Sequence, residues 1–133
     1  MFVRKKLWPV IVLGVLVAGY LAYRYLLTTM TMFNCNYNVL SEQASPDGRY
    51  ISTVSERECG ATTTYSRVVS VRLRGAAFDG DDATSWAFVI SDQPKVTASW
   101  SGKRQLTILP NASGGTQERQ RWQDVSIEVR QVP

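Results

Sequence analysis

Histidine is missing from this sequence of 133 residues. Its absence excludes Ser-His-Asp and Cys-His nucleophilic sites, most catalytic zinc sites and the commonest general base. Cysteine occurs only twice, which is too few for a metal centre made of four cysteines. A phosphate-binding loop is also missing, because Gly114-Gly115 is not followed by the lysine and helix of a P-loop. We therefore expect a protein that is not an enzyme and that holds no cofactor and no metal.

Carboxylates are the remaining groups with catalytic or metal-binding chemistry. Glu56 and Glu58 share one face of an expected strand, where cross-strand arginines are the usual partners of such pairs. The cluster Asp79-Gly80-Asp81-Asp82 offers oxygen ligands for calcium, but it lacks the EF-hand spacing with a distal glutamate. We interpret the first pair as structural and the second cluster as a solvated loop.

Basic charge is concentrated near the N-terminus. The chain carries 15 Lys and Arg against 11 Asp and Glu, a formal net charge of +4. Four of the basic residues are Arg4, Lys5, Lys6 and Arg24, so the rest of the chain has 11 of each sign. A chain with that balance is not a nucleic-acid-binding protein on electrostatic grounds.

The long apolar run of residues 7–27 organises the chain. It reads LWPVIVLGVLVAGYLAYRYLL, and as a helix it would rise about 31 Å, which matches the hydrocarbon core of a bilayer. Residues 1–6 form a basic N-terminus, and the positive-inside rule places them in the cytoplasm and the C-terminal part in the periplasm. A cleaved signal peptide is the alternative, but the run is long and has no clean small-x-small cleavage site. We expect an uncleaved signal anchor in a bacterial inner membrane, with the lipid bilayer as one partner.

Two sets of residues in this segment predict contacts within the membrane. Small residues recur at every fourth position, a spacing that lets a second helix approach one face closely. This small-residue stripe consists of Gly14, Ala18 and Ala22. Aromatic residues and an arginine mark the two membrane interfaces. The interface residues are Trp8, Tyr20, Tyr23, Arg24 and Tyr25.

Cys35 and Cys59 both follow the apolar segment. In an oxidising compartment they are the only intramolecular pair that the chain offers. A bridge would close a loop of about 25 residues and contribute roughly 3–3.5 kcal/mol in the chain-entropy model. Two separately buried, reduced thiols are the alternative.

The remaining sequence predicts one all-β domain over residues 45–133, after a polar connector over residues 28–44. Ser45-Pro46-Asp47-Gly48 has the chemistry of a tight turn, because proline presets φ and glycine supplies a positive φ. Alternating polarity and turn residues then predict about six strands and no helix. The expected strands are residues 50–57, 65–74, 85–90, 95–100, 105–109 and 122–132. An antiparallel sheet or a small sandwich fits this pattern.

The alternation also predicts which side chains face the core. Residues 65–74 are the clearest case, with Val69, Val71 and Leu73 expected inward and the intervening Ser70, Arg72 and Arg74 expected outward. Three tryptophans are expected to fill the core of so small a domain, and an exposed one would instead mark an interface. These are Trp86, Trp100 and Trp122.

Two stretches together resemble a family of small, uncharacterised bacterial envelope proteins. The family signature reads S-P-D-G-[KR]-Y and then R-[DE]-C-G-A-T-T before a valine-rich strand, and here it falls on residues 45–50, 57–63 and 68–73. Members are lipoproteins or membrane-anchored proteins without an established activity. The resemblance implies an envelope location and a β fold, and it implies no catalytic residue. This chain departs from the pattern in its helix anchor and in Cys35, an additional partner for Cys59.

These features lead to three hypotheses of function. The first is a non-catalytic, single-pass accessory subunit that binds a larger membrane protein complex through its helix and its β domain. The second is a membrane-anchored periplasmic immunity protein that neutralises a toxin directed at the envelope, a hypothesis based on analogy of fold. The third is an enzyme that uses Glu56, Glu58 or the Asp79–Asp82 loop.

Overall fold

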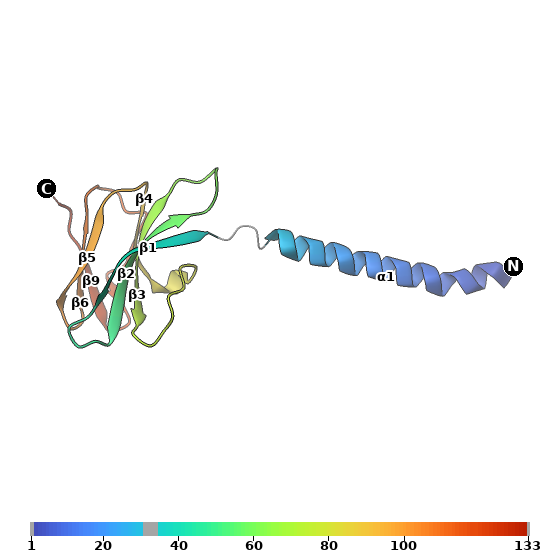
Figure 1. Cartoon of the computed structure of the whole chain (residues 1–133), viewed down its shortest axis with the longest axis horizontal. Coiled ribbons are helices and arrows are strands. Elements are labelled where there is room, and N and C mark those ends of the chain that lie inside the picture. Colours follow the sequence, from blue (N-terminus) through green and yellow to red (C-terminus); the bar gives the residue numbers. More distant parts are fainter. Residues whose placement is uncertain (1, 31–34, 133) are drawn as a thin grey trace. The chain divides into compact units, whose positions relative to one another are not determined.

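The chain divides into two units, Met1–Asn34 and Cys35–Pro133, which are described separately. The computed structural model describes residues 2–30 and 35–132, so part of the expected connector, residues 31–34, lies outside the described residues. The described part of the first unit is the helix α1 (Phe2–Met30), and that of the second is a β domain (Figure 1). A membrane-length apolar helix followed by a mostly β domain is therefore the architecture.

Helix α1 has 29 residues, and the stretch Leu7–Thr29 within it is long and apolar enough to cross a membrane, with a mean hydropathy of 1.9. Its apolar side chains are exposed, as expected for a surface that contacts lipid. Near its end, the hydroxyl of Thr29 donates to the carbonyl oxygens of Tyr25 and Leu26. These bonds satisfy helical carbonyls close to the point where the helix ends.

Residues 35–132, the described part of the β domain, form two sheets. The first has five antiparallel strands in the order β1-β2-β3-β4-β7, and the second has four strands in the order β5-β6-β9-β8. The strands are β1 (Asn36–Ala44), β2 (Tyr50–Glu58), β3 (Ser66–Leu73), β4 (Trp86–Ser91), β5 (Val96–Gly102), β6 (Gln105–Pro110), β7 (Gln117–Glu118), β8 (Arg121–Trp122) and β9 (Val125–Val129). A short 3₁₀ helix, η2 (Ala83–Ser85), precedes β4.

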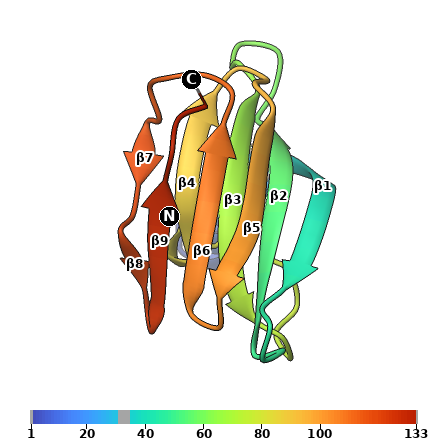
Figure 2. The same cartoon turned by 90° about the vertical axis from the view of Figure 1, so that its left-hand side faces the viewer.

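The two sheets lie face to face and share one core (Figure 2). The first sheet contributes buried side chains from β2, β3 and β4, including Val54, Val69 and Phe88. The second contributes buried side chains from β5, β6 and β9, including Leu106 and Ile108. The alternation expected for the last strand is confirmed, because every second residue of β9 is exposed, whereas β6 buries three residues in a row.

One pair of strands departs from the expected antiparallel arrangement. Strand β9 runs parallel to β6, with Leu106 opposite Ile127. The reason is the path between them: β7 lies at the edge of the first sheet, and β8 lies at the edge of the second. The expected strand at 122–132 is also divided, because Gln123 adopts φ 48° and ends β8 in a turn before β9 begins.

Two further expectations differ from the structure. Residues 36–44, expected in a connector, form β1, whose side chains are nearly all exposed, so the sequence shows no alternation there. Leu73, expected in the core, is 46% exposed. It is the last residue of β3, and the neighbouring strand β4 begins only opposite Ser70, so this end of β3 is uncovered on its β4 side.

Candidate functional site

Strand β1 is the first element of the β domain and lies at the edge of its sheet. A disulfide joins Cys35, just before β1, to Cys59, just after β2, with their Cα atoms 4.1 Å apart. The next pair in the ladder is Asn36 and Glu58. The expected bridge is therefore present, and it closes the end of the β1–β2 hairpin opposite to its turn.

A covering loop, residues 75–85, holds β1 from the outer face of the first sheet. The ring of Tyr37 lies against Gly80 so closely that a Cβ at Gly80 would overlap it. The Tyr37 hydroxyl donates to an oxygen of Asp81 at 3.1 Å and accepts a hydrogen bond from Nε of Arg57 at 3.0 Å. The edge of Tyr37 also meets the ring of Phe78. These contacts therefore fasten β1 to the covering loop on the outer face of the first sheet.

Arg57 connects this loop to β4. Its guanidinium lies over the ring of Trp86, 5.3 Å from the centroid, and Nε1 of Trp86 donates to the Gly80 carbonyl. Trp86 therefore packs under the covering loop. It was expected to fill the core, but it is not part of the core between the sheets. Burial raises the pKa of Tyr37; Arg57 opposes this rise and Asp81 adds to it. Tyr37 and Arg57 carry no local sequence signal, because their partners come from distant segments.

The opposite half of β1 is held by both sheets. Arg72 forms an ion pair with Glu42, at 2.9 Å, and also donates to the Thr53 hydroxyl. From the second sheet, Nε1 of Trp100 donates to the Gln43 carbonyl at 3.0 Å. An edge strand with so many lateral contacts is hard to detach from its sheet. The strand that follows α1 is thus held near both of its ends.

The carboxylates considered for chemistry have structural partners. Glu56 forms an ion pair with Arg67 across the β2–β3 ladder, as expected, and accepts a further hydrogen bond from Gln93. In the covering loop, an oxygen of Asp79 accepts from the Asp81 amide, and an oxygen of Asp82 caps η2 through the Thr84 amide. Among the described residues, no three His, Cys, Asp or Glu side chains converge on one point.

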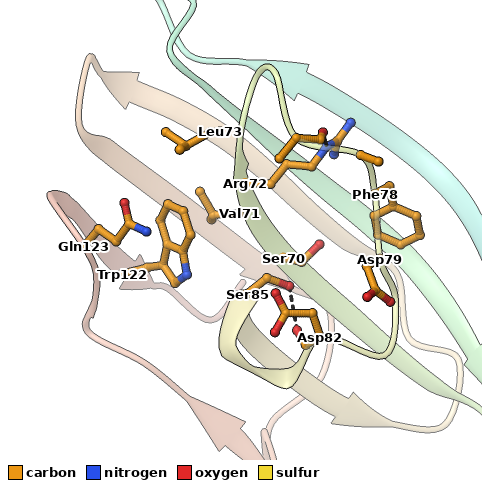
Figure 3. Close-up of a pocket in the computed structure, with 12 residues that line it drawn as sticks. Ser70, Val71, Arg72, Leu73, Phe78, Asp79, Asp82, Ser85, Trp122 and Gln123 are labelled. Carbon is orange, nitrogen blue, oxygen red and sulfur yellow. Dashed lines mark hydrogen bonds between the residues drawn. The ribbon is translucent and has the colours of Figure 1, made fainter.

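A small cavity of about 160 Å³ lies beside the uncovered end of β3 (Figure 3). Val71 and Leu73 point toward Trp122 and Gln123, whereas Arg72 points toward Phe78. Two of the polar groups around it are engaged: the Ser85 hydroxyl donates to Asp82 O, and Nε of Arg72 donates to Ala76 O. The cavity is mainly apolar and presents no nucleophile paired with a base. The cavity is better suited to accepting an apolar side chain than to catalysing a reaction.

The residues expected to act in the membrane all lie in α1. Gly14, Ala18 and Ala22 recur at four-residue spacing on this one helix, and a Cβ at Gly14 would meet no other atom within 4 Å. The interface set, Trp8, Tyr20, Tyr23, Arg24 and Tyr25, is exposed. The basic residues Arg4, Lys5 and Lys6 belong to α1, but their side chains lie outside the described residues.

Comparison with known proteins finds no matching family model, no matching curated protein and no matching solved structure. The apolar helix, which is an anchor or a signal, and the disulfide together indicate an extracytoplasmic domain of the cell envelope.

Proposed function

We propose that this chain is a non-catalytic accessory subunit that binds a larger membrane protein complex through α1 and its β domain. The observation that carries the proposal is the clamping of β1. This strand follows the membrane helix and is tied by the Cys35–Cys59 disulfide, by Tyr37 under the covering loop and by the Trp100–Gln43 hydrogen bond. Without these contacts, a force on the helix would separate β1 from β2 one residue pair at a time, because β1 is an edge strand.

The chemistry of the domain supports binding over catalysis. Glu56 and Asp82, two of the carboxylates with catalytic potential, are engaged by neighbours that fix them in place. The cavity beside β3 is mainly apolar, and two of its polar side chains, Arg72 and Ser85, are engaged by neighbours. A protein with these properties acts by holding or positioning another molecule.

The proposed topology has the N-terminus in the cytoplasm and the β domain in the periplasm of a bacterium with α1 as an uncleaved anchor in the inner membrane. The basic residues Arg4, Lys5 and Lys6 precede the span, as the positive-inside rule requires. The stripe of Gly14, Ala18 and Ala22 is the proposed contact with a helix of the complex, because small residues allow two helix backbones to approach.

Copurification of the tagged full-length chain in a mild detergent tests the proposal. The expected result is a defined set of membrane subunits at a fixed ratio. Ala18→Leu places bulk on the stripe and is expected to remove these subunits. Leu16→Phe is the matched control, because it adds bulk about 160° away around the helix and leaves the stripe intact. A chain that is always recovered alone, or only with a soluble toxin, contradicts the accessory role; the second result favours the immunity hypothesis.

A further inference from the structure

Five exposed cations gather at one end of the β domain, although the domain as a whole has as many acidic as basic residues. They lie in four separate turns or turn-flanking positions at the end of the sheets opposite to the Cys35–Cys59 disulfide. We call this set the basic pole. It consists of Arg49, Arg74, Lys103, Arg104 and Arg121.

Hydrogen bonds and ring contacts show that these turns are neighbours. In the first sheet, the Arg74 amide donates to the Arg49 carbonyl at 2.9 Å. In the second sheet, Ser126 is the common neighbour: its amide donates to the Arg104 carbonyl, and its ladder partner is Arg121.

Tyr50, next to Arg49, joins the two sheets at this end. Its ring stacks on Trp100, with centroids 6.4 Å apart, and meets the edge of Trp122 at 6.0 Å. Its hydroxyl donates to an oxygen of Asp124 at 3.5 Å. The basic pole is thus one surface built over an aromatic cluster.

Few negative charges offset this surface. The same turns hold two carboxylates, Asp47 and Asp124. Asp47 accepts from the Ser45 hydroxyl and the Arg49 amide, and Asp124 lies 3.8 Å from Arg104. The rest of residues 35–132 holds six cations and nine carboxylates. The domain is therefore a charge dipole, and its neutral total conceals a positive end.

The arrangement of the cations favours an extended ligand over a small one. They come from both sheets and are exposed, so they do not converge on one small anion. Four of the five are arginines, whose planar fork of N–H donors matches the oxygens of carboxylates and phosphates. An extended chain of regularly spaced oxyanions would meet several of them together. Each contact would release counterions and add to the affinity.

We propose that the basic pole binds an extended polyanion of the cell envelope, either an acidic polysaccharide or a phosphate-linked polymer. The shared chemistry is a row of oxyanions on a flexible chain. The pole lies roughly 30 Å from Cys35, at the far end of the nine-residue strand β1. This proposal is independent of the accessory role, because it uses no residue of α1 and needs no protein partner.

The test uses the full-length chain in nanodiscs of zwitterionic lipid, with long-chain polyphosphate and polygalacturonate as separate probes. Binding is followed by tryptophan fluorescence over a range of salt concentrations, since Trp100 and Trp122 lie under the pole. Wild-type protein is expected to bind at least one probe, less tightly at higher salt. The double variant Lys103→Gln/Arg121→Gln is expected to bind about tenfold or more weakly, with its salt slope reduced by about 1.4 for two lost contacts.

Lys95→Gln/Arg130→Gln is the control, because it removes the same net charge from exposed positions outside the pole. It is expected to bind within about twofold of wild type. Preference for polyphosphate identifies a phosphate-linked polymer, and preference for polygalacturonate identifies an acidic polysaccharide. The proposal is overturned if neither probe binds, if both double variants weaken binding equally, or if poly-L-glutamate binds as tightly as the preferred probe, which would indicate an acidic protein partner.

Discussion

Tyr37 lies directly against Gly80, and this contact joins the first strand of the domain to the covering loop. Glycine is required at this position because a Cβ would overlap the phenol ring. The same ring is bonded through its hydroxyl to Asp81 and Arg57. Tyr37 therefore has little freedom to move aside.

Replacing Gly80 with alanine tests this packing. We expect a loss of about 1–3 kcal/mol in the free energy of unfolding, typical of overpacking at a rigid contact, and a lower thermal midpoint. Gly75→Ala is the matched control, because it lies in the same loop and a Cβ there would meet nothing within 4 Å. Circular dichroism melts of the full-length protein in detergent measure the thermal midpoints of the two variants. Equal melting points for the two variants would show that Tyr37 does not press on Gly80.

The raised pKa of Tyr37 predicts a loss of stability in alkali. Burial favours the neutral phenol in the folded protein. Between the unfolded pKa, about 10, and the higher folded pKa, the folded state holds more protons than the unfolded state. The stabilisation is thus complete below pH 10 and declines as the pH rises through the folded pKa. Unfolding midpoints measured above pH 10 are expected to fall less steeply in Tyr37→Phe than in wild type; parallel curves would exclude this contribution.

The disulfide predicts sensitivity to reduction. Removing it through Cys35→Ser/Cys59→Ser is expected to lower the free energy of unfolding by about 3 kcal/mol in the chain-entropy model. Dithiothreitol is expected to lower the melting point of the wild type and to leave that of the double variant unchanged. A wild-type melting point that is insensitive to the reductant would mean that the bridge adds no stability.

Two of the arginine–glutamate pairs differ in burial and therefore predict different costs when the carboxylate is removed. Arg67 and Glu56 are largely buried, with side chains 15% and 18% exposed, whereas those of Arg130 and Glu128 are 63% and 58% exposed. Truncating a carboxylate leaves its partner uncompensated, which is costly only where water cannot solvate the partner. Glu56→Ala is expected to destabilise by about 2 kcal/mol or more, and Glu128→Ala is expected to have a much smaller effect because water solvates both members of that pair. Similar urea midpoints for the two variants would contradict this ranking.

Local patterns in the sequence predicted most of the strands, and non-local packing explains the rest. Val69, Val71, Leu106 and Ile108 alternate with polar residues and are buried as expected. The turn at Pro46 and the strand that begins at Tyr50 also follow from local chemistry. Strand β1 gave no such signal, because an exposed edge strand needs no alternation.

The parallel pairing of β6 and β9 depends on where β7 and β8 join their sheets, which the composition of β9 does not reveal.

The candidate functional surfaces likewise combine features that local sequence patterns predicted with features that only the folded chain reveals. The disulfide followed from counting cysteines, and a cross-strand arginine partner for Glu56 followed from strand spacing, although only the structure identifies that partner as Arg67. The basic pole was hidden because its cations come from separate turns, so only the folded chain places Arg49 near Arg74 and Arg104 near Arg121. The equal numbers of acidic and basic residues gave the net charge of the domain correctly, but they did not show where in the domain the charges lie.

The accessory role is tested most directly by photo-crosslinking in native membranes. A photoreactive amino acid is placed at Ala18, on the small-residue stripe, or at Leu16, on the opposite side of α1. The accessory role predicts a discrete adduct of constant mass from position 18, containing another membrane protein, and mainly lipid adducts from position 16. Lipid adducts alone from both positions would show that α1 is only an anchor and would contradict the proposed membership of a membrane complex.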